Sequence, residues 1–554
     1  MFKALSTPVT TRLKKVRVEK YQGLKNAPPN PIKYLIRFCS THQHQVLEME
    51  LWSEVVGALS SLLLLLLSLV CALLLLLRRR PRLNLPPRPS PRLPLLGDIL
   101  HLRHLNQNPH SYLDYLCHRL GPIFTLSLGR IPFIYITSAS LVHEALVEKG
   151  RIFAARPQLP SRAVITGNYR SINTSSYGAH WRTMRRNLVQ EMLTIPKVLS
   201  FKSARIRILD NLISRMQAEA QQNEGIVSVY SNLHRAMVQL LLFMCFGFDM
   251  SEDALLEMSD LIVEILRLPV SSLTDFYPSL KLFNGLSAKP QVSLPALRAR
   301  QLRVFTSHIE KHRELGKLGQ LTKGSYVETL LRMEEAGTVF LAEDLVTFCT
   351  EFLVGGIDTT ATTLEWAMAR LVLHPDIQCK LYDEIHGVTG DRPVDEEDLP
   401  QLPYLRSIVK ETLRLHPAFP FLLPHTVSEP CKIGDYDIPM GSIVLFTNAY
   451  ISRDPKVWHE PLMFKPERFL VADVDITGIK EVTMVPFGAG RRICPGLGLG
   501  IMHTELFVAR LVQALEWAMH PLEETVDLSE KNGFTIGMKH SLRALVKERK
   551  SAML

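Results

Sequence analysis

The sequence predicts a mainly α-helical chain with a minor β-sheet and a single transmembrane helix near the N-terminus. Helical spacing of apolar residues fills most of 196–332, and a largely apolar stretch runs through 341–373. Two short strand-like runs, at 123–128 and 131–136, predict a β-hairpin that starts the minor sheet. An uncharged apolar run at 55–77 predicts the membrane helix.

The run at 55–77 is long enough to cross a bilayer. As a helix it would span roughly 34 Å, against ~30 Å of hydrocarbon. It ends directly in three arginines, 78–80, so it predicts an uncleaved signal-anchor rather than a cleaved signal peptide. Basic residues without acids follow the run, whereas glutamates precede it. The positive-inside rule then places the C-terminal bulk in the cytosol.

The chain therefore divides into four predicted segments. They are a basic N-terminal extension (1–54), the signal-anchor (55–77), an Arg/Pro-rich linker (78–97) and one globular domain (98–554). The extension is either an organelle transit segment or sequence upstream of a true start at Met49. We favour the second interpretation, because a transit segment and a signal-anchor would be two competing addresses.

Composition excludes several classes of protein. With 46% hydrophobic and 21% charged residues, the chain is not intrinsically disordered. Its eight cysteines form no CxxC pair, which argues against a disulfide framework and a four-ligand zinc site. Part of the net charge of +10 belongs to the strip that follows the anchor. Nothing in the charge pattern predicts nucleic-acid binding.

Three more helices are predicted inside the globular domain. They cover 142–148, 405–415 and 500–517. The second of these is stopped by His416-Pro417, and short strands and turns separate it from the third.

One cysteine lies in a motif that predicts iron chemistry. Phe487, Gly490, Arg492, Cys494 and Gly496 match the pattern Phe-x-x-Gly-x-Arg-x-Cys-x-Gly. Glycine lets the backbone, and with it the sulfur, approach a flat macrocycle closely. The N–H dipoles of the following helix would favour the thiolate. The alternative, a structural cysteine in a turn, is disfavoured by these neighbours.

On this motif the chain resembles the cytochrome P-450 heme-thiolate family. The resemblance implies heme b as cofactor, with Cys494 as the axial ligand of the iron and Phe487 among the heme contacts. It implies a membrane-anchored monooxygenase that uses O2 and electrons from NADPH, delivered by a partner flavoprotein reductase. With the anchor, it implies an endoplasmic reticulum membrane protein that contacts lipid, whose catalytic domain (98–554) is cytosolic.

A second motif lies in the middle of the stretch at 341–373. It reads Gly355-Gly356-Ile357-Asp358-Thr359-Thr360. Glycines inside a helix cost ~1 kcal/mol each relative to alanine, so we expect them to make room for a small ligand. By resemblance, Thr359 hydrogen-bonds the bound oxygen and Asp358 helps to relay protons. Without the first motif, an ordinary kinked core helix would be an equal interpretation.

The resemblance also implies residues that hold the heme carboxylates. Trp181 and Arg185 fall one helical turn apart and could both reach one carboxylate. Arg492 and His425 are the other candidates. Many relatives carry arginine where His425 stands, and a histidine there can instead bond a backbone carbonyl.

A buried ion network is implied beneath the heme. Glu411 and Arg414 lie three residues apart on one helix face, and Arg468 follows downstream. Taken alone, the Glu-x-x-Arg pattern is weak, because exposed helices often carry it.

A basic face is implied on the cysteine side of the domain, where the acidic reductase would dock. Its candidate residues are Arg182, Arg185, Arg186 and Arg491. The alternative is a solvated basic surface without a partner.

The expected substrate is a lipophilic molecule with one polar end. By family topology, five mostly apolar segments would line its pocket: 165–177, 266–283, 348–355, 421–423 and 533–535. Short stretches at 424–427, 458–461 and 475–487 resemble land-plant microsomal members, within them a group associated with in-chain hydroxylation or epoxidation of long-chain fatty acids. A terpenoid, steroid or phenolic substrate is the alternative.

Three other functions compete with the monooxygenase. The first is a heme-thiolate enzyme that rearranges hydroperoxides, which Asp358-Thr359 and the anchor disfavour. The second is a non-catalytic membrane hemoprotein, which the complete motif set disfavours. The third is an organelle enzyme with a ferredoxin partner, which only the first 48 residues favour.

Overall fold

The computed structural model describes most of the globular part of the chain and one N-terminal helix. The described residues are 52, 54–72, 83–90, 97–107, 109–128, 131–268, 273–276, 293–472 and 474–549. Most of the predicted extension and much of the predicted linker lie outside them. The chain forms two compact units, Met1–Leu83 and Asn84–Leu554.

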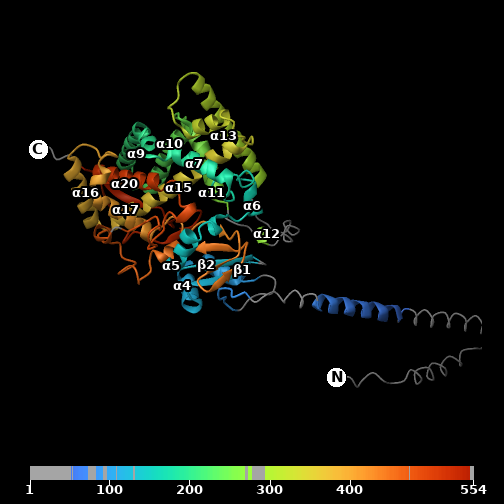
Figure 1. Cartoon of the computed structure of the whole chain (residues 1–554). Helices are drawn as coiled ribbons and strands as arrows, with labels where there is room; N and C mark the ends of the chain where they lie inside the picture. The colour runs from blue at the N-terminus through green and yellow to red at the C-terminus, as the bar shows by residue number, and fades with distance from the viewer. Residues whose placement is uncertain are drawn as a thin grey trace, which may run out of the picture. The chain divides into compact units, whose positions relative to one another are not determined.

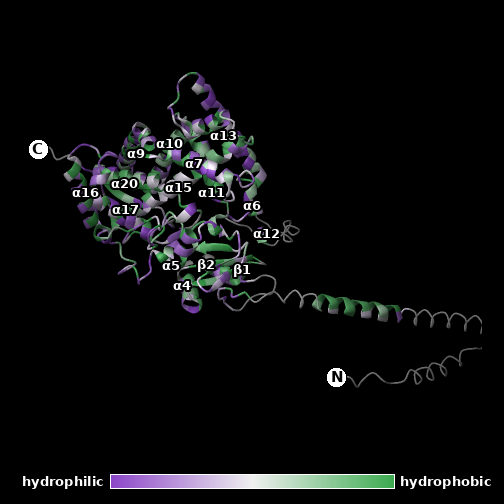
Figure 2. Cartoon of the chain, in the orientation of Figure 1, coloured by the Kyte–Doolittle hydropathy of each residue, from purple (hydrophilic) through white to green (hydrophobic). Residues whose placement is uncertain are grey.

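In the first unit, the helix Glu54–Ala72 is long and apolar enough to span a membrane. Its mean hydropathy is 2.6, and its most apolar stretch has no residue buried by the rest of the protein. Figure 2 shows it as almost uniformly hydrophobic. Among the described residues, it is the one helix with these properties. It coincides with most of the predicted run at 55–77, whose last residues, 73–77, are not among those described.

The second unit is mainly helical, as predicted, and Figure 1 shows its helices gathered above the strands β1 and β2. In chain order the helices are α3 (Ile99–Gln107), α4 (Pro109–Leu120), α5 (Ala139–His143), α6 (Pro160–Ala163), α7 (Ala179–Met192), α8 (Ile195–Leu199), α9 (Lys202–Gln222), α10 (Val229–Phe246), α11 (Glu252–Leu266), α12 (Leu273–Phe276), α13 (Leu294–Lys317), α14 (Tyr326–Glu335), α15 (Asp344–Leu373), α16 (Pro375–Thr389), α17 (Pro403–Leu415), α18 (Asn448–Ile451), α19 (Arg468–Val471) and α20 (Leu497–Ala514).

Four strands form the largest sheet in the described chain, in the order β1-β2-β7-β4. They are β1 (Ile123–Leu128), β2 (Ile131–Ile136), β7 (Ile443–Phe446) and β4 (His425–Thr426). β1 and β2 pair antiparallel, which confirms the predicted hairpin, and β2 pairs parallel with β7. The edge strand β4 pairs with β7 through His425 and Val444, and this pairing fixes the position of His425.

The remaining described strands form three small sheets, in the orders β3-β11-β8, β5-β6 and β10-β9. They are β3 (Ile226–Ser228), β5 (Cys431–Ile433), β6 (Tyr436–Ile438), β8 (Leu515–Met519), β9 (Glu530–Asn532), β10 (Ile536–Met538) and β11 (Arg543–Glu548). β8 corrects the predicted helix at 500–517, because α20 ends at Ala514 and Trp517 pairs with Val546 of β11. Burial alternates along β8, which is the period of a strand, but five residues are too few to reveal that period against a preceding helix.

α15 is the central helix of the domain. Its 30 residues run roughly 45 Å, and the largest apolar core is built around it and α10. A Cβ on Gly356 would lie 2.8 Å from Cδ1 of Leu241, so glycine at this position lets α10 approach closely. A Cβ on Gly355 would meet nothing within 4 Å. Only Gly355 therefore leaves the open space that was expected of both glycines.

A buried ion network joins α17 to the first residue of α19 and to the segment before it. Arg414 forms a bidentate pair with Glu411, at 2.7 and 2.8 Å, and both side chains are fully buried. Arg468 reaches the same carboxylate at 3.1 Å. The rest of the Arg414 guanidinium donates to three backbone carbonyls and lies 5.0 Å from the Trp458 ring. Every charge in the network therefore has a partner, as a buried charge requires.

We expect Arg414→Ala to lower the free energy of unfolding by ~3–5 kcal/mol, because it leaves the Glu411 carboxylate buried without its main partner. Denaturant unfolding of the detergent-solubilised protein measures this change. The matched control is Arg313→Ala, which breaks an exposed pair with Glu334 at 3.2 Å and should cost less than ~1 kcal/mol. Equal losses in the two variants would contradict the network's importance.

Candidate active site

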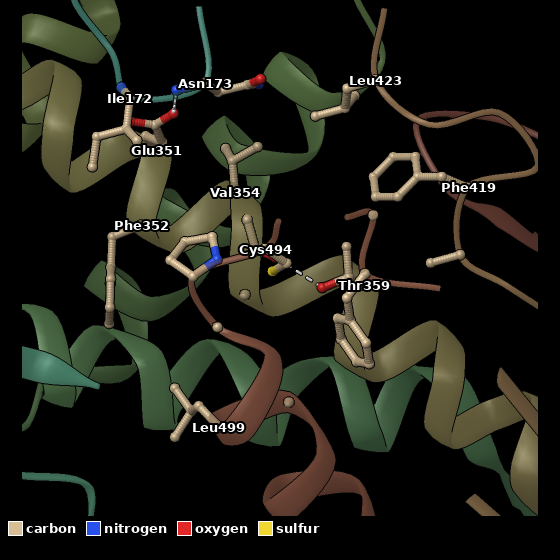
Figure 3. A pocket seen from close by; sticks show the side chains of 18 of the residues that line it. Ile172, Asn173, Glu351, Phe352, Val354, Thr359, Phe419, Leu423, Cys494 and Leu499 are labelled. Atoms are coloured by element: carbon tan, nitrogen blue, oxygen red, sulfur yellow. Dashed lines mark hydrogen bonds between the residues drawn. The ribbon is translucent and has the colours of Figure 1, made fainter. Parts of the chain in front are cut away.

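Residues of both sequence motifs line one cavity in the second unit. Phe487 and Cys494 come from the segment before α20, and Gly355 and Thr359 come from α15. The cavity has a volume of about 320 Å³. Figure 3 shows Cys494 and Thr359 among the side chains that line it. The fold therefore brings together two motifs that are far apart in the sequence.

The segment that carries Cys494 is held tightly in place. Gly490 has a φ of +66°, and a Cβ there would collide with the carbonyl oxygen of Leu146. The Cys494 N–H donates to the Phe487 carbonyl at 2.8 Å, which closes the loop. A Cβ on Gly496 would lie 3.9 Å from the cysteine sulfur. Gly490 therefore allows close backbone packing, which helps to hold the sulfur in the cavity wall, whereas Gly496 leaves ordinary contact space beside the sulfur.

The surroundings of Cys494 act on its charge in opposite directions. Burial raises the pKa of the thiol, whereas a hydrogen bond from the Gly496 N–H and the charge of Arg185 lower it. α20 begins at Leu497, nearer to the sulfur than predicted, so its N-terminal dipole also favours the thiolate. A metal ion in contact with the sulfur would dominate these effects, because a coordinating thiol is deprotonated outright.

Thr359 and Asp358 are neighbours on α15 but serve different cavities. Thr359 lines the cavity of Cys494, and its hydroxyl donates to the Gly355 carbonyl at 2.8 Å. Asp358 lines a second cavity on another face of α15. Its carboxylate accepts hydrogen bonds from the Tyr230 hydroxyl at 2.7 Å and the Thr535 hydroxyl at 2.5 Å. The structure therefore places Asp358 away from the cysteine, a feature that the sequence did not reveal.

A cluster of basic and aromatic side chains lines the cavity near Cys494. It includes Trp181, Arg185, His425 and Arg492, as the resemblance implied, and it adds Arg156. Arg492 lies 4.8 Å and Arg185 5.8 Å from the Trp181 ring. No local motif marks Arg156. A β-bridge between Ala155 and Thr426 brings it beside His425, and such a long-range contact leaves no signal in the sequence.

This cluster fits a ligand that carries carboxylates. Burial and the neighbouring Arg492 lower the pKa of Arg156 to about 9. Burial chiefly lowers the pKa of Arg492 to about 10, with repulsion from Arg185. The Nε1 of Trp181 and the Nε of Arg156 are buried donors without a hydrogen-bond partner in the described structure. Concentrated positive charge and unsatisfied donors in one wall are what two heme carboxylates require.

His425 has a backbone partner on one side. Its Nδ1 lies 2.6 Å from the Phe153 carbonyl, and burial, Arg156 and Arg492 lower its pKa well below the usual value. A neutral ring whose Nδ1 donates to this carbonyl is the consistent assignment. His425 therefore does bond a backbone carbonyl, and it also lines the cavity.

The remaining wall is mostly apolar. Of the five predicted lining segments, four contribute: Ile172 and Asn173, Phe348 to Gly355 in part, Leu422 and Leu423, and Phe534. Leu266, Gly533 and Thr535 line the second cavity instead, and much of 266–283 lies outside the described residues. Phe421 was expected here but packs against Tyr135, with 6.0 Å between the ring centroids.

Comparison with known proteins identifies the family of this fold and site. The family model described as cytochrome P450 matches residues 86–544. Cytochrome P450 89A9 of Arabidopsis thaliana is 37% identical, covering 84% of this chain and 94% of that protein. Isoflavone 3'-hydroxylase of Medicago truncatula is 34% identical over 84% of this chain and 92% of its own length. Geraniol 8-hydroxylase of Catharanthus roseus is 32% identical, with 83% and 94% covered.

A solved structure agrees with these sequences. A zebrafish cytochrome P450 with progesterone has a TM-score of 0.67 and 25% identity. The match covers 80% of this chain and 99% of that one.

Cys494→Ser should abolish thiolate ligation of heme. We expect the red-shifted Soret band of the carbon monoxide complex, measured on the reduced membrane-bound protein, in the wild type and not in this variant. Cys379→Ser is the matched control, because Cys379 is an exposed free cysteine outside the cavity. A wild type that is folded but lacks the band would refute the role of Cys494.

Proposed function

The chain belongs to the cytochrome P450 family and is a monooxygenase of that family; from this premise we propose the reaction that its site performs. It inserts one oxygen atom of O2 into a lipophilic substrate, with electrons from NADPH delivered by a flavoprotein reductase. The observation that carries the proposal is the single cavity shared by Cys494 and Thr359, beside the basic cluster. The chemistry that heme supplies there when bound is activation of O2, promoted by electron donation from the axial thiolate.

The residues of the chain bind and orient the heme, donate a hydrogen bond in the cavity or support the fold. Cys494 is the ligand of the iron, and Phe487 packs beside it. Trp181, Arg185 and Arg492, together with Arg156 and His425, hold the heme carboxylates and so orient the macrocycle. The Thr359 hydroxyl donates a hydrogen bond in the cavity. Glu411, Arg414 and Arg468 keep the fold rigid beneath the cofactor.

Asp358 completes the proton supply from the far side of α15. Its carboxylate lies in a second cavity of about 740 Å³ whose wall also holds Glu365, His234 and Lys531. Water beside these charged groups can exchange protons with the carboxylate. Phe534 lines both cavities. In this proposal Asp358 exchanges protons with water in the second cavity, whereas the Thr359 hydroxyl acts in the cavity of Cys494.

The apolar helix Glu54–Ala72 suits anchoring in the endoplasmic reticulum membrane. Uncharged residues continue to position 77 and the arginines begin at 78, so 55–77 is the proposed signal-anchor and 78–97 the linker. The catalytic domain, 98–554, then lies in the cytosol, where the reductase and NADPH are available. The basic extension precedes a start at Met49 in this proposal.

Lipophilic substrates fall into two candidate classes. Long-chain fatty acids follow from the likeness of short segments to plant fatty-acid hydroxylases. Phenolic and terpenoid compounds follow from relatives whose names are isoflavone 3'-hydroxylase and geraniol 8-hydroxylase. The mostly apolar wall suits both classes, because it gains affinity from buried apolar surface.

The test of this function is turnover in microsomes that contain the protein, a plant reductase, NADPH and isotope-labelled O2. We expect a product that carries one labelled oxygen atom, and no product without NADPH. Thr359→Val should keep the carbon monoxide band but consume NADPH with less product, because it removes the hydroxyl donor. Product from a hydroperoxide, with none from O2 and reductase, would instead favour the rearranging enzyme.

The reductase should dock on the basic face around Tyr177. Arg182 and Arg491 are exposed, and both guanidinium groups lie over the Tyr177 ring, at 5.8 and 5.4 Å. Arg186 is exposed on the same helix, α7, whereas Arg185 turns inward and donates to the Ile493 carbonyl. Three of the four predicted arginines are thus available to an acidic partner.

Charge reversal of this face, Arg182→Glu with Arg491→Glu, should raise the KM for the reductase several-fold at low salt. Rising ionic strength should weaken binding of the reductase to the wild type. It should therefore reduce the difference in KM between the wild type and the double variant. Reductase titrations at several salt concentrations measure this. Arg313→Glu, on the distant exposed pair, should leave the KM unchanged. Turnover that ignores both salt and the double variant would exclude this docking face.

A further inference from the structure

Glu351 places a carboxylate in the wall of the substrate cavity. It lies on α15 two turns before Thr359 and lines the same space. Its oxygens accept the backbone N–H groups of Ile172 at 2.6 Å and Asn173 at 2.5 Å. Figure 3 shows Glu351 on α15 pointing towards Ile172 and Asn173 in the non-helical segment above the helix. The carboxylate therefore fastens this segment over the cavity.

Asn173 adds a second polar group at the same place. Its residue is exposed and lines the cavity, and only its backbone N–H is used by Glu351. Within the described structure the side-chain amide has no hydrogen-bond partner. An amide carries two donor hydrogens and an acceptor oxygen, so it can adapt to a ligand that approaches Glu351.

Several other polar groups of the cavity have roles or partners already described. The three arginines, Trp181 and His425 form the basic cluster. The hydroxyls of Thr359 and Thr363 donate to backbone carbonyls of α15. Glu351 and Asn173 lie beside the basic cluster, because Arg492 donates to the Ile172 carbonyl and its charge acts on Glu351. We name this pair the polar corner.

We propose that the polar corner of Glu351 and Asn173 binds a hydroxyl or phenol group of the substrate, so that the enzyme selects neutral lipophiles carrying a hydrogen-bond donor. The inference rests on the proposed monooxygenase function and narrows its substrate class. An ionised carboxylate only accepts hydrogen bonds, and its two oxygens offer about four lone-pair positions. The two backbone donors leave positions for a ligand hydroxyl. A ligand carboxylate would meet like charge whenever Glu351 is ionised, so it is disfavoured at a pH above the pKa of Glu351.

Burial of Glu351 favours a further hydrogen-bond donor at this corner. It raises the pKa of Glu351 to about 7, against the opposing effects of the two N–H bonds, Ser171 and Arg492. A further donor from the ligand would stabilise the charged form. Hydrogen bonds to charged groups are roughly twice as strong as neutral ones, so one such bond can orient a molecule that is otherwise apolar.

The corner is also rigidly placed. Arg170, just before Ile172, forms a bidentate pair with Asp344 at 2.6 Å on both arms. Asp344 and Glu351 lie two turns apart on one face of α15, so two carboxylates hold the same segment. Gly167, Asn168 and Tyr169 all have positive φ, so the chain turns sharply just before Arg170. Preorganisation of this kind reduces the entropy lost on binding.

Paired probes test the corner independently of catalysis. The pairs are dodecanol with dodecyl methyl ether, and naphthol with methoxynaphthalene, because each ether keeps the apolar body and lacks the donor. Dodecanoate probes the carboxylate. Binding is read from the absorbance shift of the heme in protein that shows the carbon monoxide band. In the wild type we expect at least one donor to bind about tenfold more tightly than its ether, and dodecanoate more weakly than dodecanol.

Three variants distinguish ligand recognition by the polar corner from its structural role of holding the segment that carries Ile172 and Asn173. Glu351→Gln and Asn173→Ala should reduce the donor-to-ether ratio of affinities towards one. Asp344→Asn loosens the same segment but leaves the corner's groups intact, so it should weaken both probes and preserve the ratio. Because the ratio compares two ligands on one protein, a general loss of structure cancels from it.

Equal affinities within both pairs, or a ratio that survives Glu351→Gln, would overturn the proposal, as would failure of both donors to bind. Tighter binding of dodecanoate than dodecanol would overturn it in favour of the fatty-acid class. Absence of the carbon monoxide band in the wild type would instead refute the proposed function itself. The two failures are therefore distinguishable.

Discussion

The active site depends on the position of one buried helix, α15, whose residues line two different cavities. Successive residues of an α-helix point about 100° apart, so Asp358 and Thr359 face different cavities although they are neighbours. The close contact of α10 at Gly356 sets how near the helix lies to the core. A larger side chain at Gly356 would move Thr359 relative to Cys494, because both depend on the same packing.

Burial of charge is handled in two contrasting ways. Around Glu411 and Arg414 every charge has a protein partner, so that network is complete and supports the fold. Around Arg156 and Arg492 the guanidinium groups accumulate, with lowered pKa values and an unpaired donor. Glu351 offsets part of this positive charge, and three arginines against one carboxylate still favour an added anion. The same physical rule thus separates a structural group from a binding group, and it does so without reference to any motif.

Sequence alone predicted what is local and periodic. The hairpin and the central helix follow from spacing within a few turns. The resemblance to a family, rather than spacing alone, implied the role of the cysteine segment and the buried pairing of Glu411 with Arg414. The contribution of Arg156 and the orientation of Asp358 did not, because each depends on contacts between distant segments. Trp517 was assigned to a helix because a short strand directly after α20 has no turn residue to mark the boundary. Long-range pairing, rather than residue type, decided all three.

The polar groups lie at different positions along α15, and their spacing affects which carbon of the substrate is oxidised. Once the basic cluster binds the cofactor's carboxylates, a substrate meets mainly apolar surface, which supplies affinity but little orientation. A lipophile held by apolar contacts alone can present several carbons to the reacting centre. A single hydrogen bond at the corner of Glu351 and Asn173, fixed to the helix that also carries Thr359, sets a constant distance between the anchored group and the oxygen-binding side. The site of oxidation is then counted from the hydroxyl of the substrate, and the length of α15 between Glu351 and Thr359 determines which carbon is reached.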